Sequence, residues 1–179
     1  YKRQESAREE VSRGQDVYRI HRAPRWPAAP LPPTASPTRD SAWHYRAREG
    51  DASRAADGDP GTAWTVTHPL RGDEFWEVTF GRKFLELDWL VLPLDRNSEF
   101  PTRFRVAGRN ADGSWTELAR LDDAHILQIV DQLLKDPGRA RLGFELGGRK
   151  AMGISLLVAE GATSYDGWRL EEVEIGARP

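Results

Sequence analysis

From about residue 41 onward, short apolar runs alternate with polar positions, and Gly, Pro, Asn and Asp separate the runs. Alternation with a period of two is typical of strands that bury one face. In the run FWEVTF, Trp76, Val78 and Phe80 fall on the same face. The pattern predicts strands over 75–80, 84–94, 103–108, 114–121, 140–146, 151–160 and 167–176. Short strands joined by turn residues favour an all-β sandwich or jelly roll.

One segment departs from this pattern and predicts a single amphipathic helix over 123–135. Either Asp122 or Asp123 provides an N-terminal cap, and Asp136-Pro137-Gly138 ends the helix. Its apolar positions follow helical spacing and predict a stripe packed over the sandwich: Ile126, Leu127, Val130, Leu133 and Leu134.

Residues 1–40 differ in composition from the rest of the chain, being first charged and then rich in proline. This predicts an extension or linker ahead of a domain over 41–179. A short helix is expected before Gly14, followed by a short strand around Val17–Ile20. The segment 24–37 is rich in proline, which lacks a backbone donor, so it is expected to be an extended strap or linker rather than a central strand.

The charge and composition exclude several classes of function. The formal net charge is −2 with acids and bases intermixed, which does not suggest a nucleic-acid surface or a polybasic membrane patch. The chain has no cysteine, and no apolar run approaches the roughly 18 residues that cross a bilayer. It opens at Tyr1 and its only methionine is Met152, so we interpret it as part of a longer parent chain.

Motifs of familiar catalytic chemistry are missing from the sequence. There is no phosphate-binding loop, no nucleophile elbow and no H-E-x-x-H motif. The four histidines are scattered without metal-ligand spacing, and no carboxylate pair is singled out. The sequence therefore predicts a protein that is not an enzyme.

The stretch AADGDPGTAW, residues 55–64, gathers acids, glycines and a threonine on sharply turned backbone. Calcium takes six to eight oxygen ligands and accepts backbone carbonyls readily. The EF-hand spacing does not fit, because Gly61 stands where that loop needs a third acid or amide. From chemistry alone, a plain surface turn and a cation-binding corner both remain open.

Four stretches in the same order resemble the F5/8 type C (discoidin) domains, which include the family 32-like carbohydrate-binding modules of galactose-binding-like fold. They are AADGDPGTAW with FWEVTFG, FPTRFRVAGRNADGSWTELA, GISLLVAE and GWRLEEVEIG. The resemblance covers about residues 41–176 and implies a jelly-roll β-sandwich with the helix as an insertion. It also implies a core that includes Trp64, and structural roles for Trp115 and Trp168.

The resemblance implies a structural Ca²⁺ that ties the first loop to the closing strand, with Asp57, Asp59, Thr62 and Glu172 as ligands. It also implies a sugar site on the loops at one end of the sandwich. Trp43, His44 and Tyr45 are expected on such loops. The residues favoured for binding are His68, Arg71, Arg96, Asn97 and Tyr165.

The expected function is a non-catalytic carbohydrate-binding module within a larger extracytoplasmic (periplasmic or extracellular) or membrane-anchored bacterial protein. Its expected partners are a glycan or glycoconjugate and the rest of the parent chain, with neither nucleic acid nor direct membrane insertion. The alternative is a structural or protein–protein interaction domain of the same fold without a sugar site. The usual R-Y-I-R-L arginines are missing around AMGISLL, which weakens the transfer of a sugar site.

Overall fold

The computed structural model describes residues 8–13, 16–21, 37–94, 99–121, 123–136, 140–159, 162 and 167–179. The chain divides into two units, residues 1–30 and 31–179. In the first unit, β1 (Arg8–Arg13) pairs antiparallel with β2 (Asp16–His21). The prediction of a helix before Gly14 is therefore wrong, because this segment is the first strand of a hairpin. The proline-rich segment up to residue 36 lies outside the described residues.

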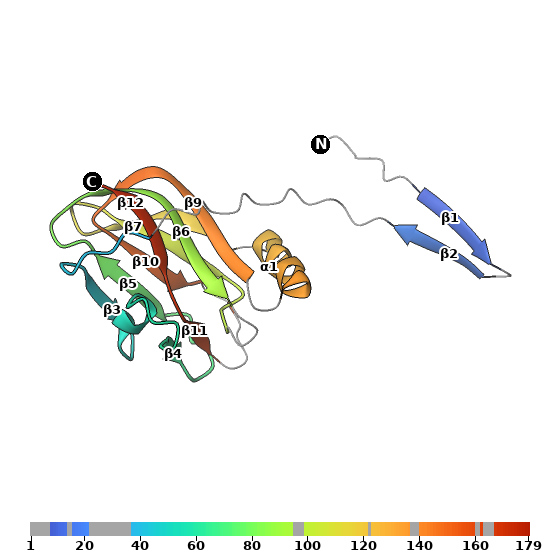
Figure 1. Ribbon diagram of the computed structural model, residues 1–179, viewed down its shortest axis with the longest axis horizontal. Coiled ribbons are helices and arrows are strands. Elements are labelled where there is room, and N and C mark those ends of the chain that lie inside the picture. Colours follow the sequence, from blue (N-terminus) through green and yellow to red (C-terminus); the bar gives the residue numbers. More distant parts are fainter. Residues whose placement is uncertain are drawn as a thin grey trace. The chain divides into compact units, whose positions relative to one another are not determined.

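The second unit is built from antiparallel strands in three sheets (Figure 1). The five-stranded sheet has the order β3-β5-β10-β7-β8 and contains β3 (His44–Ala47), β5 (Phe75–Thr79), β10 (Gly153–Val158), β7 (Phe104–Arg109) and β8 (Trp115–Arg120). The three-stranded sheet has the order β12-β6-β9 and contains β12 (Glu174–Arg178), β6 (Leu85–Leu94) and β9 (Ala140–Ala151). A two-stranded sheet pairs β11 (Trp168–Leu170) with β4 (Trp64–Val66).

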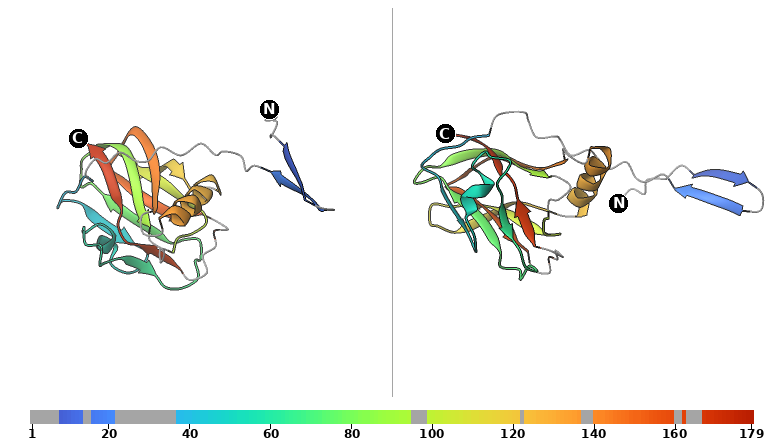
Figure 2. Two further views of the ribbon diagram at one scale, coloured as in Figure 1. Left: turned by 45° about the vertical axis from the view of Figure 1, so that its right-hand side comes forward. Right: turned by 60° about the horizontal axis from the view of Figure 1, so that its bottom comes forward.

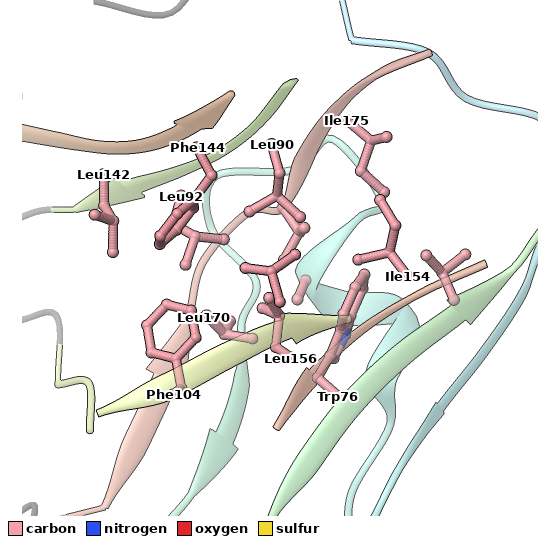
Figure 3. Packing of buried hydrophobic residues seen from close by; sticks show 14 of the residues in the cluster. Trp76, Leu90, Leu92, Phe104, Leu142, Phe144, Ile154, Leu156, Leu170 and Ile175 are labelled. Atoms are coloured by element: carbon pink, nitrogen blue, oxygen red, sulfur yellow. The ribbon is translucent and has the colours of Figure 1, made fainter. Parts of the chain in front are cut away.

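The hydrophobic core lies between the two larger sheets. Figure 3 shows Leu90, Leu92 and Phe144 of one sheet pointing toward Trp76 and Leu156 of the other. Trp76 and Val78 are completely buried and Phe80 nearly so, as the alternation in FWEVTF predicts. Burial of large aromatic side chains dominates the energetics of small sandwich cores. The fold is the predicted all-β sandwich.

The helix α1 (Asp123–Lys135) has the predicted bounds and packs beside β9 (Figure 2). The predicted apolar stripe is partly wrong. Val130 and Leu134 are exposed, at 47% and 81% of their surface, whereas Ile129 is buried. Ile126, Ile129 and Leu133 make the buried face, so the i, i+3, i+7 set packs inward. The side-chain amide of Gln132 fixes the helix further by bonding both the N–H and the carbonyl of Arg141 on β9.

Two other expectations are corrected. Trp43 is buried in the segment just before β3, and His44 and Tyr45 lie on β3 itself, so His44 and Tyr45 are strand residues and not loop residues. The single closing strand expected over 167–176 is two strands, β11 and β12, which belong to different sheets. Among the described residues, no helix is long and apolar enough to cross a membrane.

Candidate functional site

The loop over residues 56–62, called the acidic corner below, follows a short 3₁₀ helix, Ala52–Ala55. The N-cap of that helix, Asp51, accepts hydrogen bonds from the N–H and the hydroxyl of Ser53. The loop then turns through Gly58, whose φ of +79° is one that glycine adopts without strain. The Asp57 carboxylate accepts from the N–H of Asp59, and the Asp59 carboxylate accepts from the N–H of Gly61. The two acids therefore fold the loop by local side-chain-to-backbone bonds.

Oxygen atoms gather around the Thr62 hydroxyl in this loop. Its Oγ1 lies 2.9 Å and 2.8 Å from the two carboxylate oxygens of Asp57. It also lies 3.0 Å from the carbonyl of Asp59 and 3.1 Å from the carbonyl of Arg54. A hydroxyl has a single proton, so it can donate to only one of these four oxygens at a time. Such a collection of oxygens fits a hard cation such as Ca²⁺, which binds carboxylate, hydroxyl and carbonyl oxygens together.

Glu172 joins this loop to the C-terminal segment between β11 and β12, because it accepts a hydrogen bond of 3.1 Å from the N–H of Gly58 on Oε2. Its Oε1 is buried, has no hydrogen bond among the described residues, and lies 3.1 Å from Nη2 of Arg39. Burial raises the pKa of Glu172, and the charge of Arg39 opposes that shift. Glu172 is thus a partly buried carboxylate with one buried oxygen, and Arg39 is the positive charge that faces it.

The corner therefore brings together the four residues expected to bind calcium, in two groups. Asp57, Asp59 and Thr62 share one loop, and Glu172 reaches that loop at Gly58. Within the part of the chain that the structure describes, no three Asp, Glu or His side chains converge tightly enough to form a metal cluster. A cation here would be held largely by the Arg54 and Asp59 carbonyls, Thr62 and the Asp57 carboxylate. The Arg39 guanidinium lies against the same corner, and sequence reasoning did not find it.

Of the five predicted sugar-binding residues, the structure describes two. His68 and Arg71 lie on the loop between β4 and β5, at the end of the five-stranded sheet where β5 begins. The His68 ring bonds the carbonyl of Pro69 and lies 3.2 Å from Oε1 of Glu49. The Pro69 carbonyl and Glu49 raise the pKa of His68. Arg71 is exposed. Arg96, Asn97 and Tyr165 lie outside the described residues, so their place at this end remains a prediction.

The side chain of Glu74 fixes the backbone of this loop. Its side chain is buried and accepts hydrogen bonds of 2.6 Å and 2.9 Å from the N–H groups of Arg71 and Gly72. Burial acts to raise the pKa of Glu74, but the backbone donors outweigh it and the net shift is downward. The ionised carboxylate is therefore part of the folded loop that carries His68 and Arg71.

The ordinary pKa of this carboxyl is 4.5, and the pKa of Glu74 in the folded chain is lower. We therefore expect the free energy of unfolding to fall as the pH drops from 4.5 through the lowered pKa of Glu74. A depressed pKa means that the unfolded state takes up the proton first, so the stabilisation is present above that range and lost beneath it. Urea unfolding measured from pH 7 to pH 3 should show this slope, and it should be shallower in Glu74→Gln. The same slope in both proteins would show that Glu74 does not contribute.

A second feature, which the sequence analysis missed, is a pocket of about 530 Å³ on the outer face of the five-stranded sheet. It lies at the opposite end of β5 from His68 and Arg71, the two predicted sugar-binding residues that the structure describes, and neither of them lines it. The lining side chains come from β3, β5, β7, β8 and the turn before β8: His44, Tyr45, Arg46, Glu77, Thr79, Arg109, Gly113 and Trp115. Trp115 was expected to be structural, but it is only half-buried and lines this pocket.

The turn before Trp115 is tightly bonded. Asp112 accepts from the N–H and the hydroxyl of Ser114, and Asn110 donates to Ser114 and Thr116. These hydroxyl and backbone donors lower the pKa of Asp112. Strand register places Trp115 directly opposite Arg109 on β7. The sequence NADG is typical of a turn, but nothing in a linear pattern says that the tryptophan after it faces a pocket.

Comparison with known proteins found no matching family model and no matching curated relative. Solved structures do match. The family 32 module of NanJ from Clostridium perfringens, solved with galactose, has a TM-score of 0.57 at 16% identity over 75% of this chain and 93% of its own. The fold is that of the family 32 carbohydrate-binding modules. The predicted galactose-binding-like sandwich is thereby confirmed as a fold.

Two further solved structures match this chain at similarly low sequence identity. The module CpGH89CBM32-5 from Clostridium perfringens, solved with GalNAc-β-1,3-galactose, has a TM-score of 0.54 at 14% identity, covering 75% of this chain and 94% of its own. A family 89 glycoside hydrolase from Clostridium perfringens has a TM-score of 0.54 at 12% identity over 76% of this chain. That match covers 14% of the hydrolase, so this fold occurs there as one part of a much longer enzyme chain.

Proposed function

We propose that this chain is a non-catalytic carbohydrate-binding module of a larger extracytoplasmic or membrane-anchored protein. The observation that carries the proposal is the likeness over about three quarters of the chain to modules solved with galactose and with GalNAc-β-1,3-galactose. The loop end around His68 and Arg71 supports it, because imidazole and guanidinium groups suit the hydroxyls of a sugar.

A binding role without catalysis is also supported by the chemistry of the described pocket. Glycoside hydrolysis by the common route needs two carboxylic groups flanking the bond that is cleaved. Among the described residues that line this pocket, Glu77 is the one carboxylate, and Arg46 donates to it at 2.6 Å. A carboxylate held in this way is suited to a structural or hydrogen-bonding role.

The test is a glycan array with the chain in calcium-containing buffer, compared with the double variant His68→Ala, Arg71→Ala. We expect a specific signal that falls at least about tenfold in the variant, because both polar contacts at the loop end are removed. Arg149→Ala, an exposed arginine on β9, is the matched control and should bind as the native chain does. A blank array would favour the interaction-domain alternative.

We further propose that the acidic corner binds Ca²⁺ as a structural ion through Asp57, Asp59 and Thr62, with Glu172 facing it. The support is the set of four oxygens around the Thr62 hydroxyl and the buried Oε1 of Glu172. When bound, the ion would supply positive charge that ties the first loop to the segment before β12. It would also let Glu172 stay ionised in a buried place.

Calcium should raise the melting temperature by about 5–10 °C at a hundredfold excess over Kd. The linkage stabilisation is then about 2.7 kcal/mol, and each kcal/mol moves the melting temperature by about 2–4 °C in a domain of this size. The rise should vanish in Asp57→Asn. Asp112→Asn alters a similar turn between β7 and β8 and should retain the full rise. Equal melting temperatures in EDTA and in millimolar calcium would rule the ion out.

A further inference from the structure

The pocket on the outer face of the five-stranded sheet lies where small and large side chains alternate across the strands. Strand register places three small, buried residues of β10 and β7 on this face of the sheet, Gly153, Ser155 and Ala107. Large polar side chains rise on either side, His44 and Arg46 from β3 and the Arg109–Trp115 pair from β7 and β8. Ligand sites in proteins fall mostly between 300 and 1,000 Å³, and the volume of about 530 Å³ lies within that range.

The flank formed by Trp115 is suited to a sugar ring. Its half-exposed indole offers an apolar surface for the C–H face of a sugar ring. The bonded turn at Asn110–Ser114 holds the tryptophan in place before any ligand arrives. Binding to a preorganised side chain avoids the entropy cost of ordering it.

The charges of the pocket favour an anion. Arg46 and Glu77 neutralise each other through a hydrogen bond of 2.6 Å, and Arg46 also lies over the Phe75 ring at 5.1 Å. The Arg109 guanidinium lines the pocket and, within the described residues, takes part in no ion pair. The next acid on the same face of β8, Glu117, is engaged by Arg120 at 2.8 Å. Among the residues that the structure describes, one positive charge beside the tryptophan is therefore left without an ion-pair partner.

We propose that this pocket is a saccharide-binding site, separate from the loop end, that selects sugars bearing a carboxylate. Trp115 stacks on the sugar ring, and Arg109 binds the carboxylate through its forked N–H groups. Thr79, His44 and the exposed edge of the Arg46–Glu77 pair contact ring hydroxyls. The inference rests on the proposed function in that the ligand is a saccharide, but it concerns a different face of the domain.

The experiment uses paired oligosaccharides: oligogalacturonate, oligomannuronate and hyaluronan fragments, each beside its carboxyl-reduced neutral form. We expect at least one acidic member to bind more tightly than its neutral form. Binding of that acidic member should weaken as the salt concentration rises. Arg109→Gln should weaken that binding about tenfold or more and abolish the preference for the acid. Trp115→Ala should weaken both forms. Arg149→Ala, an exposed arginine on β9 of the other sheet, should change neither.

The variants also separate this inference from the proposed function. Binding that is lost in Arg71→Ala and kept in Arg109→Gln and Trp115→Ala would overturn the sheet-face site and leave the loop-end function standing. A blank for every acidic member would overturn the sheet-face site as well. Because Arg109→Gln changes no core residue, unchanged melting would show that lost binding is not lost folding. Trp115→Phe provides the second control, since it keeps an aromatic surface and should retain most of the binding.

Discussion

Replacing Trp168 with alanine lowers the free energy of unfolding by about 3–5 kcal/mol, as large-to-small changes of buried aromatics do. Trp168 is completely buried. Its ring lies edge-on to Trp64 with centroids 5.1 Å apart and stacks with Phe104 at 6.0 Å. The variant should also melt at least about 6 °C lower. Urea unfolding and a thermal melt measure both quantities.

Trp168→Phe is the matched control for this change. The indole Nε1 is buried and has no acceptor among the described residues, so phenylalanine removes an unpaired donor while it keeps aromatic contacts. Its loss of stability should be clearly smaller than that of the alanine variant. Equal losses would mean that shape at this position matters more than buried area.

Replacing Gly167 with alanine should cost about 3 kcal/mol or more, for two reasons that act together. Its φ of +124° lies in a region that L-residues rarely adopt. A Cβ there would also overlap the carbonyl of Val66, which faces Trp168 across the β4–β11 pair. The measurement is the midpoint of urea unfolding.

Gly72→Ala separates these two reasons. Gly72 has a φ of +90°, but a Cβ there would meet nothing within 4 Å. Its cost should be about 1–2 kcal/mol, that of the backbone conformation alone. If both variants lost the same stability, the crowding at Val66 would carry no weight.

The sequence predicted the fold well where one face of a strand is buried and the other is not. Trp76 and Val78 illustrate this, because alternation reports burial directly. It failed for the first hairpin, since Arg8–Arg13 is charged and shows no alternation that would separate strand from helix. It also merged β11 and β12, because a chain that passes from one sheet to another leaves little trace in hydrophobic periodicity.

For the sites, what could be predicted depended on sequence distance. Asp57, Asp59 and Thr62 lie within six positions, so their common loop was visible in the sequence, and the resemblance supplied Glu172. Arg39 was missed because it lies near the start of the domain sequence and its partner Glu172 lies near the end, and no motif links the two. The sheet-face pocket was missed for the same reason. Its walls come from β3, β5, β7 and β8, and only strand order brings them together.

Thr38 bonds the last strand of the domain at three points. Its N–H donates to the carbonyl of Ile175, its hydroxyl donates to the carbonyl of Ala177, and the N–H of Ala177 donates back to that hydroxyl. The chain thus enters and leaves the sandwich at the same place. Such a domain can be inserted into a loop of another protein with little loop-closure cost. Circular permutation should also be tolerated, because Thr38 is already hydrogen-bonded to Ala177 at the other end of the domain.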